Sequence, residues 1–81
     1  MHAKTDVIAI LSNAFAPLEC LGELQDYDSK FGFRVYGAED QDLYTRGMIP
    51  IREGRDPAGL DVVIRIARAA LSSKGYATPG G

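Results

Sequence analysis

Histidine and cysteine, which supply much of the nucleophilic and metal-binding chemistry of proteins, each occur only once in these 81 residues. His2 stands at a terminus that we expect to be mobile, so no Ser-His or Cys-His pair can be placed on a rigid scaffold. Cys20 cannot form an internal disulfide, which fits the reducing cytoplasm. The sequence therefore predicts a cytoplasmic protein that is not an enzyme and holds no metal or other cofactor.

Long apolar runs and an excess of basic residues are also missing. The longest uninterrupted apolar run is Val7–Leu11, whereas a membrane-spanning helix needs about 20 such residues. The first residues lack the basic and long apolar regions of a signal peptide. The net charge is −2, whereas proteins that bind phosphate backbones concentrate basic residues in one place. These absences argue against a membrane protein and against nucleic acid as a partner.

What is present is the composition of a single globular domain, which we place at residues 1–81. Hydrophobic residues make up 46% and charged residues 25% of the chain, so disorder is not expected. Residues 1–42 hold eight acidic and three basic side chains, for a net charge of −5, and residues 43–81 have a net charge of +3. The two halves could attract each other within one fold or between two copies.

The first helix is predicted over residues 5–15. Thr5 or Asp6 can cap its exposed amides, and an acidic residue there suits the helix dipole. Its apolar residues recur with the helical period, and Pro17 disfavours helical geometry at the residue before it. We therefore expect the helix to end near Phe15.

The second helix is predicted over residues 57–74. Asp56 is the N-cap candidate, and Pro57 takes the first helical position, where its missing N–H costs nothing. Gly75 is a natural residue to follow the helix, and residues 75–81 are expected to fray.

Three strands are predicted between the helices, over residues 18–27, 31–37 and 43–51, because apolar and polar residues alternate along them. The acidic segments between them lack the spacing of a calcium loop and are interpreted as turns. Residues 52–59 are predicted to be a loop. The fold class is thus α+β, in the order α-β-β-β-α: an antiparallel meander with two helices packed on one face.

Alternation along the strands divides them into a covered and an open face. The covered face is expected to hold Leu18, Cys20, Leu24, Phe31, Phe33, Val35, Leu43, Ile49 and Ile51. The open face is expected to gather Arg34, Tyr36, Tyr44, Arg46 and Met48. Because Tyr, Met and Arg are enriched in protein interfaces, these five residues are the candidate interaction face.

The second helix carries a further candidate, a basic stripe formed by Arg65 and Arg68. Asp61 precedes Arg65 by four residues, which is the favourable order for an ion pair. One interpretation is a solvated surface pair. The other is a basic ridge for an acidic partner, such as the first half of another copy.

Two features invite comparison with RNA-binding proteins. The segment KFGFRVYG is close to the signature of one RNA-binding sheet, but Arg34 stands where a core-facing valine belongs, which puts Val35 on the opposite face. The order α-β-β-β-α resembles the double-stranded-RNA-binding domain. That family has a lysine cluster at the start of its second helix, whereas this chain has Asp56 to Asp61 there, so the resemblance extends to topology and not to activity.

The segments AFAPLEC and DVVIRIARAAL, with the two short strands between them and an Arg-rich loop before the last helix, resemble a family of small proteobacterial proteins common in pseudomonads. The resemblance covers roughly residues 5–72. That family is of unknown function, so the resemblance implies a bacterial cytoplasmic origin and no activity.

We therefore expect a small non-enzymatic protein that acts by protein–protein contact and self-associates, as a homodimer. One alternative is a nucleic-acid-binding module that uses Arg34, Tyr36, Tyr44 and Arg46. Another is a phage-type inhibitor of a host protein, which the size and acidity allow.

Overall fold

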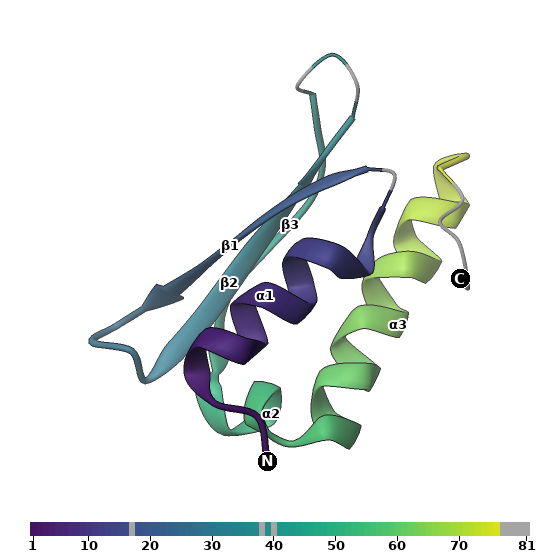
Figure 1. The fold of residues 1–81 in the computed structure, drawn as a ribbon. Coiled ribbons are helices and arrows are strands. Elements are labelled where there is room, and N and C mark those ends of the chain that lie inside the picture. The colour runs from purple at the N-terminus through teal and green to yellow at the C-terminus, as the bar shows by residue number, and fades with distance from the viewer. Residues whose placement is uncertain (17, 38, 40, 77–81) are drawn as a thin grey trace.

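One helix precedes the three strands along the chain and two helices follow them (Figure 1). The computed structural model describes residues 1–16, 18–37, 39 and 41–76. The elements are α1 (Lys4–Ala14), β1 (Glu19–Gln25), β2 (Lys30–Tyr36), β3 (Asp42–Pro50), α2 (Ile51–Arg55) and α3 (Pro57–Ser73). The predicted α+β fold with an antiparallel meander is confirmed. The short helix α2 begins at Ile51, predicted to end the third strand, and its other residues were predicted to be a loop.

Asp6 satisfies the start of α1 from within the helix. The N-cap is Ala3, which makes no side-chain cap bond, and the helix begins at Lys4. The Asp6 carboxylate accepts a hydrogen bond from the Ala3 main-chain N–H at 3.4 Å. Asp6 therefore caps an exposed amide, as predicted, but from the third helical position, because a carboxylate in the first turn can satisfy a free amide behind it. Pro17, predicted to end this helix, lies outside the described residues.

The predicted start of α3 is confirmed. Asp56 is the N-cap, its carboxylate accepts from the Ala58 N–H at 3.3 Å, and Pro57 takes the first position. The helix is followed by Gly75 with a φ of 92°, a conformation that glycine adopts without cost. Next, the Tyr76 N–H donates to the Leu71 carbonyl at 2.9 Å. Residues 75–81 were predicted to fray, and residues 77–81 of this tail lie outside the described residues.

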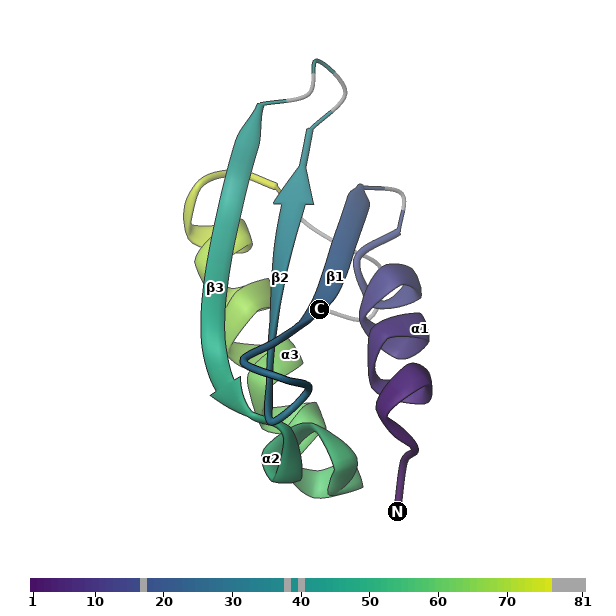
Figure 2. The same ribbon diagram turned by 90° about the vertical axis from the view of Figure 1, so that its left-hand side faces the viewer.

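The strand order in the sheet is β1-β2-β3, and the open face of the sheet is turned toward the viewer in Figure 2. β1 and β2 pair without interruption from Glu19 opposite Tyr36 to Gln25 opposite Lys30. The pairing of β2 with β3 has two register shifts, between Phe31 and Phe33 and between Val35 and Tyr36. Each shift inserts one extra residue into β3 and so changes which β3 side chains face the helices.

The core lies between the sheet and the helices α1 and α3, which cover the same face (Figures 1 and 2). Its largest fully buried side chains come from both layers: Phe15, Phe31, Leu11, Leu60, Leu71, Val7 and Val35. The Phe15 and Phe33 rings stack with centroids 5.7 Å apart. Among the predicted core residues, Phe31, Phe33, Val35, Leu43 and Ile49 are buried, whereas Leu18, Cys20, Leu24 and Ile51 are half-buried and pack against the cluster.

Candidate functional site

Arg34 and Tyr36 lie side by side on the open face of the sheet, as predicted. The Arg34 Nη1 donates to the Tyr36 hydroxyl at 3.3 Å, and the Arg34 Cζ lies 5.9 Å from the centre of the Tyr36 ring. The Arg34 Nε also lies 3.5 Å from a carboxylate oxygen of Asp42 on β3. The hydrogen bond that Arg34 donates to Tyr36 and the charge of Asp42 raise the pKa of Arg34. Two contacts therefore hold the guanidinium in place while it remains accessible to a partner.

Leu21 is the exposed apolar residue beside this pair. It stands directly opposite Arg34 in the β1–β2 register, and 63% of its surface is exposed. Directly opposite residues of an antiparallel pair share a face, so Leu21 belongs to the open face. A hollow of about 220 Å³ lies between Leu21, Arg34, Tyr36 and Thr45. The open face thus combines an apolar side chain, an aromatic ring and a fixed positive charge.

Gln25 closes one end of this hollow, and the sequence analysis gave it no role. Its Oε1 accepts from the Met48 main-chain N–H at 2.7 Å, and its Nε2 donates to Glu23 at 3.0 Å. To reach β3 the amide passes over Gly32 of β2, where an added Cβ would lie 2.9 Å from Oε1. Only glycine therefore leaves room for a contact that ties the two outer strands together across the central one.

The other three candidates lie on β3, where the register shifts change which side chains face the helices. Tyr44 pairs with the buried Val35, and its ring centre lies 5.7 Å from that of Phe33, so it packs on the helix-covered side. Arg46 is paired with Phe33, but it also lines the hollow of the open face together with Arg34 and Tyr36. Met48 is 56% exposed, at the shift between Phe31 and Phe33, with a φ of 57°. The predicted grouping on one face therefore holds for Arg34 and Tyr36, and fails for Tyr44 because it lies between the two register shifts of β3.

The same placement bears on the nucleic-acid alternative. That alternative requires Arg34, Tyr36, Tyr44 and Arg46 to present one basic and aromatic surface. The structure packs Tyr44 against the core, so the four residues do not form one surface. Asp42 and Glu23 lie close to Arg34 and oppose a phosphate there.

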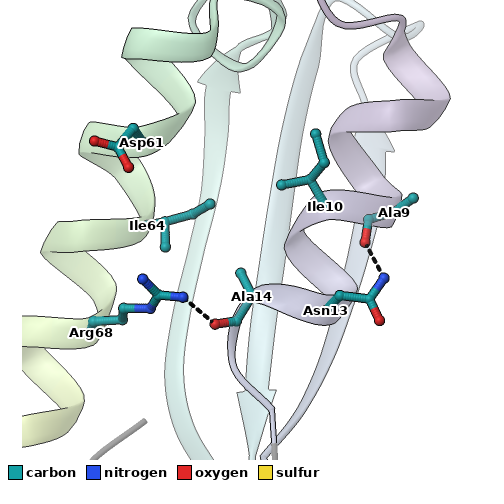
Figure 3. A pocket seen from close by; sticks show the side chains of 7 residues that line it. All are labelled: Ala9, Ile10, Asn13, Ala14, Asp61, Ile64 and Arg68. Carbon is teal, nitrogen blue, oxygen red and sulfur yellow. Dashed lines mark hydrogen bonds between the residues drawn. The ribbon is translucent and has the colours of Figure 1, made fainter. Parts of the chain in front are cut away.

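The two arginines predicted to form a basic stripe on α3 lie in different environments. Arg65 Nε pairs with the Asp61 carboxylate at 2.9 Å on the solvent side of the helix. Arg68 is part-buried and turns toward α1, where its Nη2 donates to the Ala14 carbonyl at 2.7 Å (Figure 3). Arg68 therefore holds the end of α1 against α3. The two arginines do not form one exposed basic stripe.

Arg68 also borders a groove of about 500 Å³ between α1 and α3. Ile10 and Ile64 line it from the two helices, with Asp61 one helical turn before Ile64 (Figure 3). The buried Arg68 Nε has no hydrogen-bond partner among the described residues. Because that atom is covered and the Nη2 is already engaged, the guanidinium serves the packing of the helices more than it serves the groove.

Cys20 is half-buried in β1, and burial raises its pKa from 9.0 to about 11. The thiolate is the form that reacts with alkylating agents. We expect iodoacetamide to modify Cys20 at pH 8 roughly 100-fold more slowly than it modifies an unfolded peptide containing cysteine, because the thiolate fraction falls by about that factor. Mass spectrometry at successive times measures the rate. A rate equal to that in urea would contradict the burial of this thiol.

The chain matches no protein-family model, no curated protein and no solved structure. The resemblance to the pseudomonad family accordingly stays a prediction. Within the part of the chain that the structure describes, no group of three or more His, Cys, Asp or Glu side chains could hold a metal ion. No described helix combines the length and the apolar character needed to cross a membrane.

Proposed function

We propose that this is a cytoplasmic, non-enzymatic protein that acts by protein–protein contact, that the open face of the sheet is the contact surface, and that a second copy is its partner. The observation that carries the proposal is the exposed Leu21 beside the fixed Arg34 and Tyr36. Tyr and Arg are the residues most often found at the energetic centre of protein interfaces, and an adjacent apolar side chain adds the area that is removed from water.

The charges of the open face favour a second copy. Glu19 and Glu23 form an acidic row on β1, and Lys30 and Arg34 form a basic row on the neighbouring β2. Two such faces can stack about a two-fold axis that runs along the strands between β1 and β2. The acidic row of each copy then lies over the basic row of the other, which is the self-complementarity that a symmetric dimer requires.

The size of the face predicts a weak dimer. The axis places only β1 and β2 of the two copies over each other, and two strands about 4.8 Å apart and about 23 Å long give a contact face of roughly 220 Å². Stable complexes bury about 800 Å² on each partner, and smaller contacts are transient. We therefore expect association that is half complete at roughly 100 µM protein and that weakens as salt is added.

Sedimentation equilibrium between about 10 µM and 1 mM tests the proposal. Leu21→Lys is expected to leave a monomer throughout this range, because it places a positive charge in the acidic row, over the basic row of the other copy. Val62→Lys is the matched control, since Val62 is 53% exposed on α3, away from the sheet. A wild-type protein that is monomeric at 1 mM would refute self-association, and equal loss in both variants would refute the sheet face as its site.

A further inference from the structure

The outer edge of β1 is a second surface: the self-association proposed above uses the glutamate side chains of this strand but not the main-chain N–H and C=O groups of its outer edge. β1 is the first strand in the order β1-β2-β3, so its other side pairs with no described strand. Figure 1 looks onto this side of the sheet, with β1 and α1 nearest the viewer. An unpaired strand edge presents free N–H and C=O groups in the spacing that another strand needs.

β1 is the edge whose geometry is suited to strand addition. Its seven residues pair with β2 in one unbroken register, and no residue of the strand has a positive φ. The opposite edge, β3, has two register shifts and a left-handed residue at Met48. The Lys74 Nζ also donates to the Leu43 carbonyl of β3 at 2.6 Å. Bulges and occupied carbonyls are the features by which sheets block an edge, and they protect β3 alone.

α1 provides the floor for an added strand. The helix crosses β1 at Gly22, where an added Cβ would lie 3.4 Å from two side-chain atoms of Ile8. Figure 2 shows α1 displaced beyond β1, on the side away from β2. A groove of about 440 Å³ runs between Ser12 of α1, Leu18 and the β1 residue Cys20. A strand placed next to β1 would therefore have this groove and the helix on one side and solvent on the other.

The charge of the edge decides what kind of segment fits. Glu19 and Glu23 are exposed on the open side of β1, four residues apart, with the exposed Leu21 between them. Antiparallel pairing of two β1 strands about Gly22 would bring four glutamates onto one face and place the two Glu23 side chains diagonally across from each other. Like charges that close destabilise a strand pair, so self-pairing is disfavoured and a basic partner is favoured.

We infer that the outer edge of β1 binds an extended segment of another protein by strand addition. The segment carries Lys or Arg at two positions four residues apart, opposite Glu19 and Glu23. Between these two basic positions, the residue next to each of them is apolar and faces α1, where it packs near Ile8 or Leu18. The main-chain ladder supplies affinity, and the two glutamates select the basic segment over an acidic one.

The test titrates the 15N-labelled protein at 20 µM, below the expected self-association, with the peptide acetyl-Ser-Lys-Val-Thr-Val-Lys-Ser-amide. We expect amide shift changes confined to residues 18–25 and the adjoining face of α1. The same peptide methylated on two successive main-chain nitrogens is expected to lose binding, because at least one of those N–H groups faces β1. The double variant Glu19→Lys and Glu23→Lys should bind this peptide about tenfold more weakly and prefer the peptide with Glu in place of Lys.

Four results would overturn the inference: no binding of the peptide at millimolar concentration, equal binding of the methylated peptide, equal binding of the acidic and basic peptides, or shift changes centred on another element. Slow amide exchange along the outer edge of β1 without peptide would also overturn it, because a second copy would then occupy the edge. Arg34→Ala separates this inference from the proposed function, since it should abolish the dimer and leave peptide binding unchanged.

Discussion

Replacement of Phe31 with alanine is expected to remove about 3–5 kcal/mol from the free energy of unfolding. A domain of this size has about 4–12 kcal/mol in total, so the variant should be largely unfolded or close to it. Phe31 is fully buried in the central strand. Its ring meets α2, since an added Cβ on Gly54 would lie 2.8 Å from the Phe31 Cε1. Its loss leaves a cavity where the sheet, α1 and α2 meet, and urea unfolding followed by circular dichroism measures the cost.

Val62→Ala is the matched control for this prediction. Val62 lies on α3 and is 53% exposed, so its truncation opens no cavity, and alanine is the better helix former. We expect its unfolding free energy to stay within about 0.5 kcal/mol of the wild-type value. A Phe31→Ala variant as stable as the Val62→Ala variant would mean that the ring is not part of the core.

The parts of the fold that could be predicted are those where a local pattern and the tertiary environment agree. α3 combines an N-cap at Asp56, a proline at the first position and apolar residues at helical spacing, and the structure confirms each of them. β2 alternates strictly at Phe31, Phe33 and Val35, which are all buried. Each of these signals lies within one element, so no knowledge of its neighbours is needed.

The face of β3 could not be predicted in this way, because a bulge belongs to a pair of strands. Alternation alone puts Leu43 and Tyr44 on opposite faces, whereas both pack on the core. Gly47 was a usable signal, since an isolated glycine in a strand pattern often marks a bulge. Leu43 carried no signal of this kind. The two register shifts of β3 together separate Tyr44 from the candidate interaction face.

Two further elements depend on contacts that are distant in the sequence. α2 has five residues, too few for an isolated helix, and it includes the poor helix former Gly54. It therefore depends on packing against α1 and β2. The contact between Gln25 and Met48 joins residues 23 positions apart and requires the absence of a side chain at Gly32. Neither residue has a local pattern that indicates the other.

The dependence of α2 on packing leads to the second large effect. Gly54→Val is expected to lower the free energy of unfolding by about 3 kcal/mol. Gly54 is buried and has no left-handed φ, so valine meets no backbone strain there. The added Cβ alone would lie 2.8 Å from the Phe31 Cε1 and 2.9 Å from the Val7 Cγ1, closer than carbon atoms approach. Replacement of a glycine in an exposed helix raises the free energy of unfolding. A decrease for Gly54→Val would therefore show that the added side chain clashes with its buried neighbours.

Removal of one crowding neighbour provides the control. Val7→Ala alone opens a cavity in α1 and should cost about 1–3 kcal/mol, but it also frees the space that a side chain at position 54 requires. The double variant Val7→Ala with Gly54→Val is therefore expected to be more stable than the sum of the single effects by at least 1 kcal/mol. Equilibrium unfolding of the four proteins completes the cycle. Strict additivity would mean that α1 and α2 do not meet at these residues, because two side chains that compete for one space cannot act independently.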